Sequence, residues 1–126
     1  MAKFANSKYH AQRITIDGIT FDSKKEARRW AMLKLLEKAG KINSLQRQVP
    51  FKLAPAFYVD CIEHLKTKDK VKQVLVHREM NYIADFTYYD HEGNYIVEDT
   101  KGFRTEVYRK KKNLMRRIYG IEIKET

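Results

Sequence analysis

The chain has 126 residues, 43% hydrophobic and 12% aromatic, which suits a single folded domain (residues 1–126) with one modest core. Its net charge of +10 favours a partner that carries phosphate, although ribosomal and membrane-surface proteins share this balance. The single cysteine, Cys61, excludes an internal disulfide and a multi-cysteine zinc site. No stretch has the apolar length of a signal peptide or a membrane span, so we expect a cytoplasmic protein that does not bind membranes.

The chain opens with a basic, polar arm, residues 1–13, followed by the string ITIDGITF. Apolar and polar residues alternate in this string around Asp17-Gly18, a dipeptide typical of two-residue hairpin turns. The pattern predicts a β-hairpin near the amino terminus.

A helix is predicted next. Ser23 can cap its first turn, and Glu26 lies three residues later, as in a capping box. Apolar residues then recur at helical spacing from Ala27 to Leu36, and Gly40 is a suitable helix stop.

The string INSLQRQVPFKL reads as a strand, because Leu45, Val49, Phe51 and Leu53 share one parity while the glutamines take the other. Residues 54–78 carry a weaker pattern. Their charged tract LKTKDKVKQ, residues 65–73, predicts a solvated turn or a loop between extended pieces.

Two runs of β-branched and aromatic residues between about 80 and 101 predict a second hairpin. A basic helix is expected from about 105 to 119 and a short strand in IEIKE at residues 121–125. The order is hairpin, helix, three strands, helix, strand. It indicates an α/β protein with helices covering a central mixed sheet.

The second hairpin carries ionisable residues where a buried strand rarely has them. Strand alternation places Asp99 and Lys101 on one face, and Asp85 on the neighbouring strand can lie alongside. Two close carboxylates repel unless a cation lies between them, and an all-oxygen site suits Mg²⁺ or Mn²⁺. A hard cation beside a lysine is a phosphodiester-cleaving arrangement. The structural alternative is a surface salt bridge between Lys101 and an acid.

Asp85 followed by Asp99-Thr100-Lys101 at the end of a hairpin resembles the PD-(D/E)XK nuclease signature. The strings GITFDSKKEARRW, LQRQVPFKL, YIADFTYYD and VEDTKG are similar to one branch of that superfamily, small phage and prophage proteins. The resemblance spans roughly residues 9–121, nearly the whole chain.

The resemblance implies a restriction-endonuclease-like core in the order αβββαβ and a divalent-metal-dependent DNA endonuclease. Asp85 would be the first acid, with Ala84 in place of the family's proline. Asp99 would be the second acid and Lys101 the lysine. Glu26 would match the acid that many such nucleases place on the first helix. The implied metal ligands are therefore Asp85, Asp99 and Glu26, for Mg²⁺ or Mn²⁺.

Two of these positions keep an alternative role. Glu26 suits a capping box for local reasons, yet it lies between Trp30 and Leu33 on the helical wheel and so points partly inward. Gln48 opposes the apolar parity of its strand and matches a glutamine of related nucleases. Its amide could hold a metal-bound water or pair with the backbone.

The basic residues are expected to bind phosphates without reading bases, or else to form solvated charged faces. Lys111 falls within the apolar arc of the last helix, so it can reach the active face, reach a phosphate, or extend along the core edge. The predicted DNA-binding residues are Lys24, Lys25, Arg28, Arg104, Arg109, Lys110, Lys111, Lys112 and Arg116.

The sequence therefore predicts a metal-dependent DNA endonuclease, encoded by phage and acting in the host bacterial cytoplasm in recombination, replication or packaging. With no helix-turn-helix or zinc-finger signature, we expect selection of DNA structure over base sequence. Relatives of this type suggest branched substrates such as Holliday junctions. An inactive DNA-binding accessory protein and an RNA-associated module are the alternatives, and a homodimer is left open.

Overall fold

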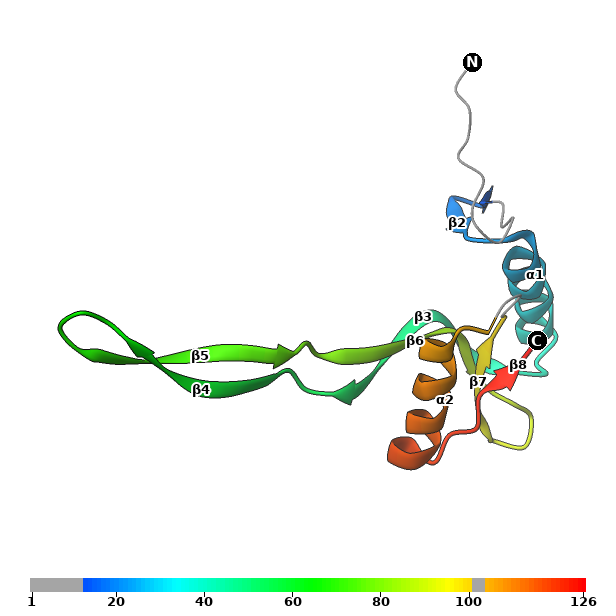
Figure 1. Cartoon of the computed structure of the whole chain (residues 1–126). Coiled ribbons are helices and arrows are strands. Elements are labelled where there is room, and N and C mark those ends of the chain that lie inside the picture. The colour runs from blue at the N-terminus through cyan, green and yellow to red at the C-terminus, as the bar shows by residue number, and fades with distance from the viewer. Residues whose placement is uncertain (1–12, 101–103) are drawn as a thin grey trace, which may run out of the picture.

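The structure is a computed structural model that describes residues 13–100 and 104–126 (Figure 1). Most of the predicted amino-terminal arm, residues 1–12, lies outside the described residues. The elements in chain order are β1 (Ile14–Ile16), β2 (Ile19–Phe21), α1 (Lys24–Lys38), β3 (Asn43–Ala54), β4 (Phe57–His64), β5 (Asp69–His77), β6 (Met80–Tyr89), β7 (Tyr95–Asp99), α2 (Glu106–Tyr119) and β8 (Lys124–Glu125).

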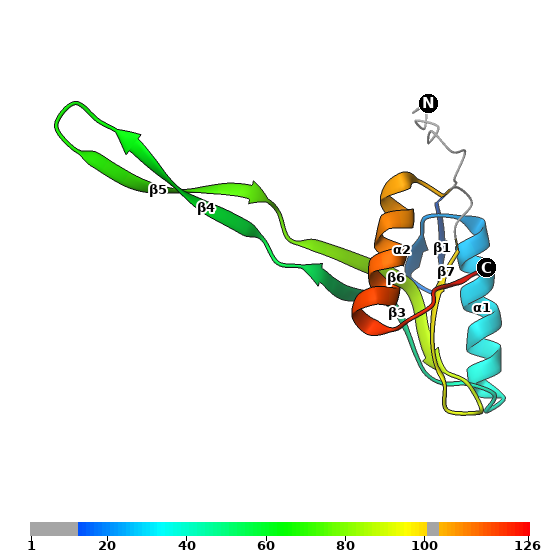
Figure 2. The same ribbon diagram turned by 60° about the horizontal axis from the view of Figure 1, so that its bottom comes forward.

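The main sheet has four strands in the order β3-β6-β7-β8. β6 pairs with β3 and β7 in antiparallel fashion, whereas β7 and β8 are parallel, so the sheet is mixed. Figure 2 shows α1 and α2 on either side of β7. The prediction of an α/β protein with a mixed sheet and two helices is confirmed.

The predicted amino-terminal hairpin and first helix are also confirmed. Asp17 and Gly18 both adopt positive φ (52° and 78°), as a tight hairpin turn between β1 and β2 requires. The Glu26 backbone N–H donates to Ser23 Oγ at 3.1 Å, which caps α1. At the other end Gly40 takes φ +78°, and the N–H of Lys41 donates to the Leu36 carbonyl, which closes the last turn.

Two apolar clusters fill the spaces between the sheet and the helices. The cluster under α2 contains Leu53, Tyr82, Ala84, Val97, Tyr108, Met115 and Ile123. The cluster under α1 contains Leu33, Ile42, Phe86 and Tyr88, with Trp30 stacked on Phe86 at a centroid distance of 5.8 Å. β7 contributes to both sides, because Val97 packs in the first cluster and Ile96 against the second.

β3 has the predicted burial alternation, with Leu53 buried and Gln46 and Gln48 exposed. Two residues depart from regular strand geometry: Ser44 and Gln48 take left-handed φ values of 58° and 55°. The pairing of β3 with β6 also shifts register near Ser44. Neither residue is glycine, so these distortions have no signal in the sequence.

The predicted loop between the extended pieces is wrong in extent. Only residues 65–68 turn, while residues 69–73 of the charged tract belong to β5. β4 and β5 form a two-stranded antiparallel ribbon that projects well beyond the body (Figure 1). Every residue of both strands is exposed, so no apolar alternation toward a core marks the segment as strand.

An ion pair between a partly exposed arginine and a fully buried glutamate joins α1 to β7. Arg29 donates from Nε to Glu98 Oε1 at 2.8 Å and from Nη2 to Oε2 at 2.7 Å, a bidentate geometry. The Tyr88 hydroxyl donates to the same Oε2. Glu98 is fully buried, and its hydrogen bond raises the pKa of Arg29. This pairing explains why a core strand carries a glutamate at residue 98.

We expect Arg29→Met to lower the free energy of unfolding by about 3–5 kcal/mol, because it leaves the Glu98 carboxylate buried without its cation. The matched change Arg28→Met, at the exposed neighbouring position, should alter it by less than about 0.5 kcal/mol. Urea denaturation followed by Trp30 fluorescence measures both variants. Equal losses in the two variants would show that the ion pair does not hold the helix.

Candidate active site

The two predicted acids lie on adjacent strands of the main sheet. Phe86 pairs with Glu98, and the same antiparallel register places Asp85 beside Asp99. Asp99 is fully buried, and the Tyr82 hydroxyl donates to its Oδ2 at 2.5 Å. Asp85 is half-buried; its Oδ2 accepts from the Thr100 backbone N–H at 2.8 Å and from Thr100 Oγ1 at 2.9 Å.

The adjacent acids Glu98 and Asp99 have different partners on opposite sides of β7. Glu98 contacts Arg29 of α1, whereas Asp99 contacts Tyr82, which belongs to the cluster under α2. This arrangement follows strand alternation, as the sequence predicts. Glu98 is fully engaged in the ion pair with Arg29, which leaves Asp99 as the acid beside Asp85.

Glu26 belongs to the same group of acids. Its side chain is buried at 5% exposure, and its Oε1 accepts from Gln48 Nε2 at 3.3 Å. Burial raises the pKa of Glu26 from 4.5 to about 7, with further increases from the negative charges of Asp85, Asp22 and Asp99. The Glu26 side chain therefore points inward, as the helical wheel predicts. The cap does not prevent this, because Ser23 binds only the backbone N–H of Glu26.

The left-handed Gln48 contributes to this grouping. Arg47 pairs with Phe86 and Val49 with Ala84, so Gln48 lies at the level of Asp85 on the neighbouring strand. The structure thus brings together Glu26 from α1, Gln48 from β3, Asp85 from β6 and Asp99 from β7. Lys101 lies outside the described residues.

The ionisable members of this group, Glu26, Asp85 and Asp99, are all carboxylates, and carboxylate oxygens are ligands that suit a hard cation. Their negative charges also repel one another, and a cation would relieve that repulsion. Its geometry is not that of an assembled metal centre. Within residues 13–100 and 104–126, no three His, Cys, Asp or Glu residues form a group that could hold a metal ion. The role of Glu26, Asp85 and Asp99 as ligands stays a prediction.

Basic residues border the acidic group at the start of α1. Lys25, Arg28 and Arg29 line a hollow of about 200 Å³ together with Met32, Thr100 and Thr126. Thr100 also binds Asp85, so this hollow reaches the edge of the acidic group. Lys24 is exposed on the same helical turn.

The predicted basic residues around α2 are partly neutralised. Arg104 and Lys112 form ion pairs with Glu125, at 2.9 and 3.1 Å, and Arg116 pairs with Glu122 at 2.6 Å. The Lys110 Nζ lies 3.7 Å from Glu106 Oε1. Arg109 is exposed and Lys111 is half-buried, as its place in the apolar arc predicts.

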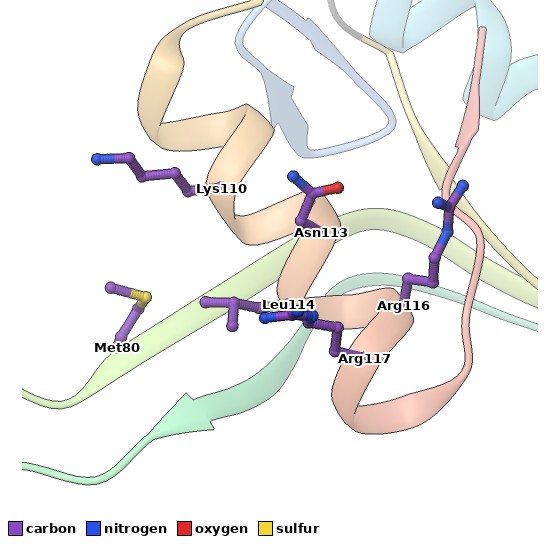
Figure 3. A pocket seen from close by; sticks show the side chains of 6 residues that line it. All are labelled: Met80, Lys110, Asn113, Leu114, Arg116 and Arg117. Atoms are coloured by element: carbon purple, nitrogen blue, oxygen red, sulfur yellow. The ribbon is translucent and has the colours of Figure 1, made fainter.

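A second, larger hollow of about 640 Å³ lies between α2 and the base of the ribbon (Figure 3). It is lined by Met80, Lys110, Asn113, Leu114, Arg116 and Arg117. The sequence does not indicate Met80 or Asn113, because this hollow depends on the packing of α2 beside β6. Nor does it indicate Arg29 and Tyr82, which bind the two neighbouring acids of β7.

These features define an α/β protein whose mixed sheet carries a group of acidic side chains from three elements beside a basic border. Residues 6–126 match the model of a family described as "Protein of unknown function (DUF1064)", and the chain belongs to this family. No curated protein and no solved structure matches the chain. No helix among the described residues is long and apolar enough to cross a membrane.

The raised pKa of Glu26 predicts a specific pH dependence of stability. The folded state holds this proton more tightly than the unfolded chain, so its contribution to stability is largest below pH 4.5 and is lost as the pH rises to about 7. Glu26→Gln keeps the acceptor for Gln48 and removes the charge. We expect it to raise the free energy of unfolding at pH 8 by up to about 3 kcal/mol and to change little at pH 4.

Urea denaturation at a series of pH values measures this difference, with Glu63→Gln, an exposed carboxylate of the ribbon, as the control. A wild-type curve that runs parallel to that of Glu26→Gln would mean that folding does not raise the pKa of Glu26.

Proposed function

We propose that this protein is a Mg²⁺- or Mn²⁺-dependent DNA endonuclease of the PD-(D/E)XK type. The observation that supports it most is the placement of Asp85 beside Asp99 on paired strands, with Glu26 close enough for both charges to raise its pKa. The element order supports it as well. With the β4–β5 ribbon set aside, α1, β3, β6, β7, α2 and β8 follow the αβββαβ order of a restriction-endonuclease-like core.

In this proposal Asp85, Asp99 and Glu26 would hold the divalent cation, which would supply positive charge among three carboxylates that repel one another. When bound, such a cation polarises a phosphoryl oxygen and lowers the pKa of a water molecule. Gln48 keeps Glu26 oriented through its amide and can position that water. Lys101 offsets charge in the transition state. Tyr82 and Thr100 fix the two aspartates through hydrogen bonds.

The basic border would receive the substrate. Lys24, Lys25 and Arg28 lie at the edge of the acidic group, where they can bind phosphates near the scissile bond. The hollow beside α2 offers Lys110 and Arg117 for a second stretch of backbone. Contacts of this kind position DNA without reading bases, which suits structure-selective cleavage of branched DNA such as Holliday junctions. Phage recombination in the host cytoplasm is the setting we propose.

One observation favours a second candidate, an inactive DNA-binding accessory protein. Asp99 is fully buried against Tyr82, and Asp85 is hydrogen-bonded to Thr100, so both aspartates already have structural partners. The basic surfaces serve this function equally well. Metal-dependent cleavage separates the two candidates.

We expect the purified chain to cleave at least one member of a panel of plasmid, linear duplex, single-stranded, flap and four-way-junction DNA when Mg²⁺ or Mn²⁺ is present. Asp85→Asn and Asp99→Asn should each lower the rate about 100-fold or more, because each removes a charged ligand from the proposed metal site. DNA binding should persist or tighten, since a negative charge is removed.

Asp17→Asn is the matched control, because Asp17 is exposed in a turn whose left-handed φ suits asparagine. It should cleave at the wild-type rate. DNA binding without cleavage by the wild-type chain would favour the accessory protein, and full cleavage by both site variants would place the active site elsewhere.

The basic border generates a separate expectation. Lys25→Gln with Arg28→Gln should weaken DNA binding and reduce the slope of log affinity against log salt by about 0.9 for each phosphate that the variant no longer neutralises. Lys38→Gln with Lys41→Gln removes the same charge at the far end of α1 and should have a smaller effect. Fluorescence anisotropy at several salt concentrations gives both slopes. Identical slopes for the two double variants would exclude this border as the DNA-binding surface.

A further inference from the structure

The β4–β5 ribbon has no partner in the described part of the chain. Its strands pair only with each other, and all their side chains are exposed. The nine residues of β5 extend roughly 25–30 Å at about 3.3 Å per residue. An isolated two-stranded hairpin is only marginally stable in water. A segment of this length without a core therefore suggests an external function.

The tip of the ribbon is strongly basic. Residues 65–72 contain four lysines and one aspartate, a net charge of +3 (four minus one). The lysines at the tip are Lys66, Lys68, Lys70 and Lys72. The aspartate, Asp69, pairs across the ribbon with His64, at 2.9 Å between Nδ1 and Oδ1.

Two of the lysines are arranged on one face. Lys70 and Lys72 share a parity within β5, so they project to the same side, with Glu63 opposite Lys70 and Cys61 opposite Lys72. Lys68 is the last turn residue before β5. The other side carries the apolar pair Ile62 and Val71, which are 63% and 65% exposed. Near its tip the ribbon thus presents a lysine face and an opposite face with one apolar pair between the polar pairs His64–Asp69 and Asp60–Gln73.

The ribbon is also continuous with the basic hollow of the body. Met80, the first residue of β6, lies in that hollow opposite Lys110 and Arg117 of α2 (Figure 3). The strand that leaves the ribbon therefore passes directly beside α2. Cationic side chains at both ends of the ribbon can contact one extended polyanion.

We infer that the β4–β5 ribbon binds the phosphate backbone of duplex DNA at a distance from the acidic group. This inference rests on the proposed function for the identity of its partner as DNA. The ribbon's length of roughly 25–30 Å spans most of one helical turn of B-DNA, about 34–36 Å, and a two-stranded ribbon fits the major groove. The lysine face supplies charge without base readout.

A second copy of the chain is the competing occupant. The apolar pair Ile62 and Val71 could pack against its equivalent, with the two lysine faces directed outward. That packing would still bring two tips, each with a net charge of +3, to within about 10 Å of each other. Like charges brought together in this way repel. The charge of the tip thus favours a polyanion over another ribbon.

The test compares two triple variants that lower the net charge equally. Lys68→Gln, Lys70→Gln and Lys72→Gln remove the lysine face, whereas Lys34→Gln, Lys38→Gln and Lys41→Gln remove three lysines from the distal half of α1 and its end. Anisotropy with labelled duplexes of about one and about three helical turns, in EDTA, measures binding without cleavage.

We expect the ribbon variant to bind the longer duplex at least about tenfold more weakly than the wild type and to show a salt slope smaller by roughly two to three. Its affinity for the short duplex should change much less. The α1 variant should stay close to the wild type on both. Equal affinity of wild type and ribbon variant for the longer duplex would overturn the inference. That result is expected if the lysines serve only to prevent edge-to-edge aggregation of the ribbon.

Light scattering of the DNA-free protein examines the competing occupant. A wild-type dimer that dissociates in Ile62→Thr with Val71→Thr, combined with unchanged DNA binding by the lysine variant, would assign the ribbon to a second copy. The outcomes also separate the two proposals. If the wild type cleaves DNA and the ribbon variant binds DNA as tightly as the wild type, only the proposal about the ribbon is rejected. If the ribbon variant binds DNA more weakly but the wild type cleaves none of the substrates, only the proposed nuclease activity is rejected.

Discussion

The fully buried carboxylate of Glu98 is the constraint on which the arrangement of this protein depends. A charge inside an apolar sheet is very costly unless a cation and further donors surround it, and here Arg29 and Tyr88 do so. Because Arg29 is on α1, satisfying this charge fixes the rotation of the helix against β7. Glu26 lies one turn earlier on the same helix, so the same bond sets its distance from the two aspartates.

In the acidic group, by contrast, carboxylates lie near one another. Glu26, Asp85 and Asp99 lie in a partly buried region where their charges repel one another, although Arg47 lowers the pKa of Glu26 to a smaller extent. Such crowding is unfavourable for stability, and proteins retain it mainly where charge is needed for chemistry. Two neighbouring acids on one strand thus have different partners: Glu98 has a bidentate cationic partner on α1, and Asp99 accepts a hydrogen bond from the Tyr82 hydroxyl.

The sequence predicts the parts of this protein whose signals are local. The Asp17-Gly18 turn, the Ser23 cap and the alternation of Glu98 and Asp99 each depend on a few neighbouring residues. The left-handed Gln48 and the partnership of Arg29 with Glu98 depend on contacts between distant segments, which spacing does not reveal. The turn between the two extended pieces of the ribbon is predicted, but the length of its strands is not, because a strand exposed on both faces has no apolar periodicity. The family resemblance indicates Asp85, Asp99 and Glu26 as site residues. Strand alternation alone is equally compatible with a surface salt bridge between Lys101 and an acid.

The pairing of Ala54 with Met80 has a consequence for how this fold can vary. The two residues face each other at the end of β3 and β6, so the chain leaves the sheet and returns to it at one point. Everything between them is therefore a modular insertion at a hairpin end, and a tight turn could replace it without breaking the sheet. Since the entropy cost of a closed loop grows only with the logarithm of its length, the fold can accept a longer or a shorter segment here while the body stays intact.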